Sequence, residues 1–170
     1  MASIEERLRI VEDYEAIKQL KAFYAKSADS KYTDDHRRKP QAEIDAITRK
    51  QVDTVFTEDG IWDGGAQFGE IQGRDAIYNH LRLGRWSFSM HYFIHPHIEL
   101  NGDTAHGTWM LWQPCTFEEG NRSMLMSAIT EDDYVRTASG WQLKRYRFIL
   151  KFLTPHDRAW SLDRNTPFKA

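Results

Sequence analysis

An aspartate at the end of a predicted helix and a histidine in an apolar stretch are the residues best suited to chemistry. Asp29 follows an amphipathic N-terminal segment, and His91 interrupts the run Phe88-Ser-Met-His91-Tyr-Phe-Ile94. A carboxylate that meets an imidazole fixes the tautomer of the ring and stabilises its protonated form, which makes the histidine a general base. The two residues therefore predict proton abstraction from a small organic molecule.

Each residue also has a purely structural interpretation. An isolated histidine in a strand is more often a hydrogen-bonded core residue, and an aspartate at a helix end often forms a turn with the backbone. Strand alternation places His91 and Phe93 on one face of the sheet. Tyr24 lies five residues before Asp29, about 140° around an ideal helix. It therefore shares a pocket with Asp29 only if the chain leaves the helix before Asp29.

A metal site is another interpretation of the segment around His91. His95, His97 and Glu99 share one face with it in an uninterrupted strand, and imidazole with carboxylate suits zinc or iron. Pro96 argues that the strand is broken there, which would scatter the ligands. We therefore expect no metal site. The chain also lacks a phosphate-binding loop, G-x-G-x-x-G and G-x-S-x-G, so neither a nucleotide cofactor nor serine-hydrolase chemistry is predicted.

Length and composition predict one soluble, cytoplasmic domain. The chain has 170 residues, is 41% hydrophobic and 13% aromatic, and carries a formal charge of −2. That balance gives no overall attraction to nucleic acid or to an anionic membrane. A single cysteine, Cys115, excludes an internal disulfide and is expected to be a small buried residue rather than a nucleophile. Neither a signal peptide nor a transmembrane run is found in the sequence.

The order of the predicted elements is helices first and strands afterwards. A capping box of Ser3 and Glu6 starts a first helix that ends near residues 28–30. Its expected buried face contains Ile10, Tyr14, Ile17, Leu20, Tyr24 and Ala28. We also expect a second helix start at Asp13 and a solvated loop at 31–40. This half is completed by a second helix at about 41–56 and a short helix at about 74–82.

The second half is predicted to be a series of antiparallel hairpins. Ile61 begins a strand after a turn at 57–60, and Asp63-Gly64-Gly65 reverses the chain. Further strands are expected at 87–94, 97–100, 104–112, 122–135 and 141–152, with turns at Asn101-Gly102 and Ser139-Gly140. The pattern indicates an α+β fold with helices on one face of a curved antiparallel sheet. One domain spans residues 1–153, and a tail at 154–170, with Trp160 and Phe168, is expected to pack on the domain or on a neighbouring subunit.

Several short motifs, in order, resemble the SnoaL-like branch of the nuclear transport factor 2-like superfamily. They are Glu15-Ala-Ile-Lys-Gln-Leu-Lys21, Tyr24, Asp29, Val55-Phe-Thr-Glu-Asp-Gly60, Gly73-Arg-Asp-Ala-Ile77, Ser89-Met-His91, Asn101-Gly-Asp-Thr-Ala105 and Gly140-Trp141. The resemblance covers nearly the whole chain to about residue 153. It implies a cone-shaped α+β barrel with helices packed in the concave face of the sheet and a ligand pocket inside. It also implies a homo-oligomer, either trimer or dimer, and no cofactor.

Within this family the chain is most similar to bile acid dehydratases, and more distantly to scytalone dehydratases and hexachlorocyclohexane dehydrochlorinases. In those enzymes a histidine–aspartate pair handles the abstracted proton. By position, the resemblance assigns these roles to His91 and Asp29, and it matches Tyr24 with the active-site tyrosine of the bile acid enzymes.

The chain departs from the family on the leaving-group side. Gln113 stands where the bile acid enzymes have a second acidic residue, and Cys115 where scytalone dehydratases have a second histidine. Lys151 lies near the position of a late arginine. Because the base is retained and these positions differ, the resemblance implies a different substrate.

The expected function is a cofactor-independent lyase or isomerase of the dehydratase type. His91 removes a proton next to a carbonyl, Asp29 holds its ring, and Tyr24 donates a hydrogen bond to the developing oxyanion. The substrate is expected to be a small apolar molecule of steroid, polyketide or aromatic type, and apolar walls are expected from Trp62, Phe93, Trp109 and Trp112. The alternatives are a non-catalytic ligand-binding or assembly protein on the same scaffold, and a polyketide cyclase that closes a ring by an aldol step.

Overall fold

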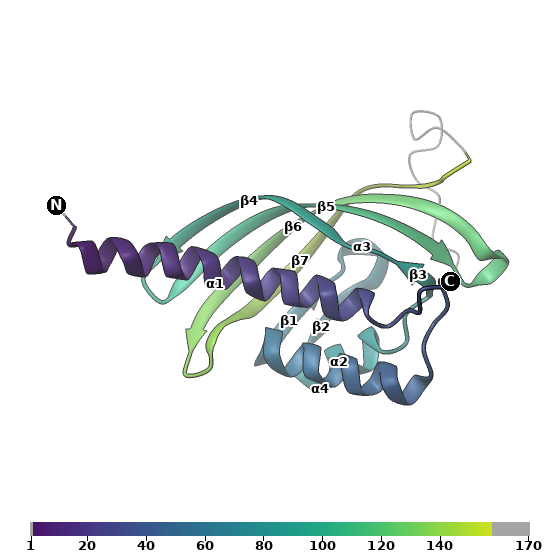
Figure 1. Ribbon diagram of the computed structural model, residues 1–170, viewed down its shortest axis with the longest axis horizontal. Helices are drawn as coiled ribbons and strands as arrows, with labels where there is room; N and C mark the ends of the chain where they lie inside the picture. Colours follow the sequence, from purple (N-terminus) through teal and green to yellow (C-terminus); the bar gives the residue numbers. More distant parts are fainter. Residues whose placement is uncertain (1, 158–170) are drawn as a thin grey trace.

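The computed structural model describes residues 2–157 and has an α+β fold, with helices followed by a strongly curled mixed sheet (Figure 1). The helices are α1 (Ile4–Asp29), α2 (Gln41–Val55), the single turn α3 (Gly65–Phe68) and α4 (Arg74–Leu81). The strands are β1 (Phe56–Asp63), β2 (Glu70–Gln72), β3 (Trp86–Ser89), β4 (Tyr92–Asn101), β5 (Thr104–Phe117), β6 (Arg122–Thr137) and β7 (Gly140–Pro155). No helix in this part of the chain is long and apolar enough to span a membrane.

The sheet follows the order β2-β1-β7-β6-β5-β3, and β4 also pairs with β5. The prediction of a purely antiparallel sheet is wrong at one pair, because β1 runs parallel to β7. A parallel pair needs a long connection between its strands, and here almost all of the sheet lies between the two strands in sequence. The helices cover the concave face, and the core fills the space between them (Figure 1).

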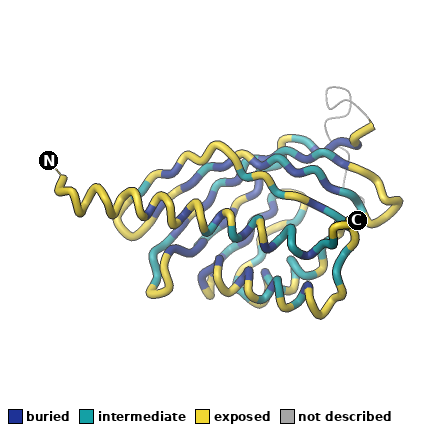
Figure 2. Tube along the Cα trace, in the orientation of Figure 1, coloured by how far each residue is buried: buried dark blue, intermediate teal, exposed yellow. Residues whose placement is uncertain are grey.

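The first helix begins as predicted, with the Ser3 side chain accepting from the Glu6 amide in a capping box. It is one continuous helix through residue 13, so the second start does not exist. Its buried face also differs from the prediction, because the buried residues are Asp13, Ile17, Lys21, Tyr24 and Ser27, whereas Ile10 is 47% exposed. The first turns of α1 extend beyond the sheet and are exposed (Figure 2), although Arg9 pairs with Asp103 at 3.3 Å.

The strands confirm two predicted hairpins and correct the first strand. β4 turns into β5 at Asn101-Gly102, where Gly102 has φ +61°, and β6 turns into β7 just before Gly140. The predicted turn at 57–60 belongs instead to β1, which starts at Phe56 and carries a register shift between Phe56 and Ile61. Chain reversal after Asp63 occurs through the one-turn helix α3 rather than a tight hairpin.

The predicted strand around His91 is interrupted. β3 ends at Ser89 and β4 begins at Tyr92, so His91 lies in the gap between two strands that both pair with β5. Pro96 does not end β4; the strand passes through it with a register shift, and His95 adopts φ +49°. The predicted tail residues Trp160 and Phe168 lie outside the described residues.

Candidate active site

The end of α1 and the gap between β3 and β4 bring Asp29 and His91 into contact. His91 Nδ1 lies 2.7 Å from Asp29 Oδ1, and the backbone amide of His91 donates to both carboxylate oxygens at 3.1 Å. The two side chains are 16% and 23% exposed, respectively. Because the strand is interrupted at this point, the His91 amide is free to bind the carboxylate instead of β5. Three contacts thus fix Asp29 relative to the imidazole ring.

A cavity of about 450 Å³ opens beside His91. Its lining comes from all four helices, from β1, β3, β5, β6 and β7, and from the 31–40 loop and the segment after α4. We call the part lined by this loop and this segment the rim. Three of the predicted site residues, His91, Trp62 and Gln113, line this cavity, and Leu111, Met126, Tyr146 and Phe148 add apolar and aromatic surface. The cavity therefore has a mostly apolar interior with the imidazole on its wall.

Three of the predicted site residues stand behind this wall rather than in it. Tyr24 is 5% exposed and stacks on Tyr146 at 5.5 Å between ring centroids. Phe93 stacks on His91 at 6.1 Å and contacts Tyr24 edge-on at 6.0 Å. Trp109 is buried and donates its indole N–H to the Tyr134 hydroxyl at 3.1 Å. These residues hold the site without lining the cavity.

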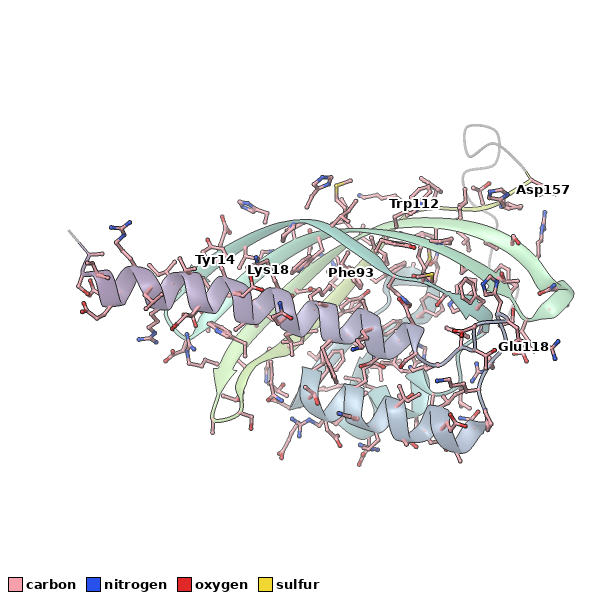
Figure 3. All side chains as sticks on the ribbon, in the orientation of Figure 1. Tyr14, Lys18, Phe93, Trp112, Glu118 and Asp157 are labelled. Atoms are coloured by element: carbon pink, nitrogen blue, oxygen red, sulfur yellow. The ribbon has the colours of Figure 1, made fainter. Side chains whose placement is uncertain are left out.

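The remaining three lie elsewhere. Trp112 packs on Phe152 on the face opposite Leu111, and Figure 3 labels it on the side of the sheet away from the helices, whereas Phe93 lies between α1 and the sheet. Lys151 is exposed on β7, and Cys115 is buried but does not line the cavity. Burial raises the pKa of the Cys115 thiol, which disfavours a thiolate. Alternation along a strand defines two faces but does not say which one faces inward.

The hydroxyl of Tyr24 is held neutral next to the cavity. Burial raises the pKa of Tyr24 to about 12, partly offset by its proximity to Trp62 and Tyr146. Trp62 is 7% exposed, and its Nε1 makes no hydrogen bond of good geometry to any acceptor in the described residues, although it lies near the Tyr24 hydroxyl. Trp62 lines the cavity, but its Nε1 atom is itself enclosed, so the N–H reaches a bound molecule only if the indole turns toward the cavity.

A buried ion pair behind the aromatic wall was missed in the sequence. Lys21 Nζ donates to Asp132 Oδ2 at 2.6 Å and to Thr130 Oγ1 at 3.0 Å, and Lys21 and Asp132 are at most 1% exposed. Tyr134 donates to the same carboxylate oxygen at 2.8 Å. Burial lowers the pKa of Lys21 and raises that of Asp132, and their mutual attraction opposes both shifts. The sequence carried a signal for this pair, because Lys21 occupies an inward position of its helix and Asp132 an inward position of its strand.

Lys21 also supports the aromatic residues next to the site. Its ammonium lies 4.1 Å from the centroid of the Phe93 ring and 4.7 Å from that of Tyr146. Cation–π contacts of this kind fix ring orientation as well as contributing attraction. Phe93 in turn stacks on His91. The ion pair is thus connected to the imidazole through a single aromatic ring.

The metal interpretation has no support in residues 2–157, where no group of three His, Cys, Asp or Glu side chains is placed to hold an ion. His97 and Glu99 face each other at 3.6 Å with side chains 75% and 70% exposed, whereas His91 lines the cavity. The strand break at residues 90–91 and the register shift at His95 separate these groups.

Comparisons with known proteins agree with this architecture. An uncharacterized protein of Mycobacterium tuberculosis is 26% identical over 148 residues, covering 85% of each chain. The structure of hexachlorocyclohexane dehydrochlorinase LinA type 2 superposes with a TM-score of 0.73 at 16% identity, covering 90% of this chain and 95% of that one. A proposed scytalone dehydratase from Novosphingobium aromaticivorans gives 0.70 at 18% identity, covering 95% and 97%.

These structural similarities concern the fold, because the sequence identities are low. The family assignment rests on the sequence itself, since the SnoaL-like domain matches residues 42–147, more than half of the chain. The cone of helices and curled sheet is the fold expected of that family. The chain belongs to the SnoaL-like domain family.

Proposed function

We propose that this chain is a cofactor-independent lyase or isomerase in which His91 removes a proton next to a carbonyl group. The observation that carries the proposal is the 2.7 Å contact between His91 Nδ1 and Asp29 Oδ1, made by an imidazole that lines the cavity. With the Nδ1 proton donated to the carboxylate, Nε2 keeps a lone pair and acts as the base. The charge of Asp29 then stabilises the imidazolium. A general base of this kind contributes about 10²–10⁴-fold to the rate.

The negative charge that develops on the substrate oxygen requires a donor inside the cavity. Trp62 Nε1 is buried in the cavity wall and lacks a well-placed acceptor among the described residues. We assign it as the donor to the oxyanion, reached by a turn of the enclosed indole toward the cavity; such a contact strengthens as charge builds up. Tyr24, whose neutral hydroxyl lies near this indole, supports it from behind the wall.

The substrate proposed for this cavity is a small ring-containing carbonyl compound. Pockets for drug-sized ligands span about 300–1,000 Å³, and the cavity of about 450 Å³ falls in that range. Gln113 places an amide on the wall where it can bind a leaving hydroxyl, which departs as water with the proton that His91 has taken from the carbon. Dehydration is the preferred reaction, with isomerisation and aldol ring closure as chemistry open to the same base.

The test is exchange of α-protons into deuterated water, followed by ¹H NMR on a panel of bicyclic ketones and β-hydroxy ketones. The wild-type chain should accelerate exchange or elimination for at least one compound, and His91→Ala should lose that acceleration. His97→Ala is the matched control, because this exposed histidine lies outside the cavity. Tight binding of the ketones with exchange no faster than in buffer would instead identify a ligand-binding protein.

A homo-oligomer is also proposed, because apolar side chains are exposed in two places. Ile4, Leu8 and Val11 lie on the projecting part of α1 at 77%, 54% and 63% exposure, and Ile94 and Met110 lie on the outer face of β4 and β5 at 43% and 48%. Contact between copies would remove this surface from water. Light scattering during gel filtration should give a dimer or trimer mass, and a purely monomeric mass would contradict the proposal.

A further inference from the structure

The rim of the cavity is positively charged. Lys31 and Arg38, from the loop after α1, and Arg85, from the segment after α4, all line it. No aspartate or glutamate among the described residues lines the cavity. Asp29, whose charge acts on Lys31, is engaged by His91. The cavity thus contains three cations and no lining carboxylate to balance them.

Lys31 is the most unusual of the three, because its ammonium is buried without a counter-ion. The residue is 8% exposed, and Nζ donates to the carbonyl oxygen of Leu81 at 3.2 Å. No carboxylate of the described residues lies within 4.0 Å of Nζ. Burial and then the charge of Arg38 lower the pKa of Lys31 to about 8, while Asp29 acts in the opposite direction. A buried charge is normally paired, so this ammonium lacks its partner.

Arg38 and Arg85 are arranged around the same opening. Arg38 donates to the carbonyl oxygens of Gly84 and Arg82, which ties its loop to the segment before β3 and fixes the guanidinium at the rim. Arg85 is exposed and forms no ion pair with any residue in the described range. The pKa of His80 is lowered mainly by burial and additionally by the positive charge of Arg85. His80 lies 4.6 Å from Trp62 between ring centroids, and both residues line the same cavity as the positive rim.

We infer that the natural ligand is an acid, that is, an apolar ring system carrying one carboxylate or equivalent oxyanion bound by Lys31 with Arg38 and Arg85. The buried ammonium supplies two further N–H donors, and a carboxylate accepts such charge-assisted bonds strongly. The ring system would occupy the apolar interior toward Trp62 and His91. This inference rests on the proposed function for the orientation of the substrate, but the anion site itself is independent of any reaction. It narrows the expected steroid, polyketide or aromatic substrate to an acidic one.

The test compares 2-naphthoate with 2-naphthamide, which share a ring system and differ in charge. Isothermal titration calorimetry with the full chain at pH 7 should show 2-naphthoate binding at least about tenfold more tightly, as expected for hydrogen bonds to a charged group. Lys31→Met should reduce naphthoate affinity by about tenfold and leave naphthamide affinity within about twofold. Arg85→Gln, an exposed position that does not threaten the fold, should reduce naphthoate affinity by a smaller factor.

Arg37→Gln is the matched control for a general effect of net charge. Arg37 lies in the same loop as Lys31 and Arg38, is exposed, pairs with Asp35, and does not line the cavity. Equal binding of the two ligands, no binding of 2-naphthoate, or equal losses in Lys31→Met and Arg37→Gln would each overturn the inference. Naphthoate preference without catalysed α-proton exchange would refute the proposed function and leave the anion site standing. Exchange without naphthoate preference would refute only the anion site.

Discussion

Removal of the Lys21 ammonium should destabilise the protein far more than an ordinary lysine substitution. Lys21 and Asp132 are 2.6 Å apart and essentially inaccessible, and Asp132 Oδ1 already lacks a partner in the described residues. In Lys21→Met the carboxylate keeps the Tyr134 hydroxyl but loses its charge partner. Breaking one side of a buried pair costs about 3–5 kcal/mol. For a chain of this size that corresponds to a fall of roughly 6–20 °C in Tm.

The unpaired charge of Asp132 should be responsible for most of the stability that Lys21→Met loses. The double variant Lys21→Met, Asp132→Asn removes both charges, and an amide can still accept from Tyr134. It should recover more than half of the stability lost in Lys21→Met, since replacing a whole buried pair is often nearly neutral. Lys18→Met is the matched control, because Lys18 pairs with Glu15 on the solvent side of the same helix at 45% exposure. It should change the free energy of unfolding by about 0.5 kcal/mol or less.

Urea titration and calorimetry measure these differences, and pH provides an independent check. An unpaired buried carboxyl has a raised pKa in the folded state, as burial already produces for Asp132. Its folded form then binds the proton more tightly than the unfolded form, so the Lys21→Met deficit should shrink as pH falls from 7 toward 4. A Lys21→Met loss similar to that of Lys18→Met, or additive effects in the double variant, would refute the reasoning.

Three further outcomes follow from the site. His91→Ala should lower α-proton exchange by about 10²–10⁴-fold with little change in Tm, since the ring is partly exposed; a large drop in Tm with intact exchange would mean a structural histidine. Asp29→Asn should slow exchange without weakening 2-naphthoate binding, because it removes a negative charge that acts on Lys31; an unchanged exchange rate would contradict a stabilised imidazolium. Lys31→Met should stabilise the protein at pH 7 by up to about 3 kcal/mol, because Lys31 has a folded pKa lowered from 10.5 to about 8. The cost of burying this ammonium is complete below pH 8 and is relieved as pH rises toward 10.5, so the difference in unfolding free energy between wild type and variant should close across that range; a pH-independent difference would exclude a buried ammonium.

Local signals determined much of the architecture. The Ser3–Glu6 capping box and the turns at Asn101-Gly102 and Ser139-Gly140 depend on residues adjacent in sequence, and the structure has all three. The order of helices and strands likewise implied helices covering one face of a curved sheet. Asp29 and His91 could be singled out in the sequence as chemically able residues, because their types stand out against apolar surroundings.

Other features depended on contacts between distant segments. The gap that frees the His91 amide for Asp29 exists because β3 and β4 pair separately with β5. Pairing of β1 with β7 could not be read from either strand alone. Trp109 and Trp112 were both expected in the cavity wall, although positions three apart on a strand lie on opposite faces and alternation does not say which face is inside. Which face of a strand is buried depends on how the whole sheet packs against the helices.

The charged residues show most clearly the difference between what local sequence patterns predict and what depends on contacts between distant segments. Lys21 and Asp132 are separated by 111 positions in the sequence, and Lys31 and Arg38 occupy a segment whose composition is that of a solvated loop. The family, the order of elements and the chemical candidates follow from local sequence patterns. Which charges are paired, buried or directed into the cavity depends on the three-dimensional fold, because desolvation and Coulomb attraction depend on distances that no local pattern encodes.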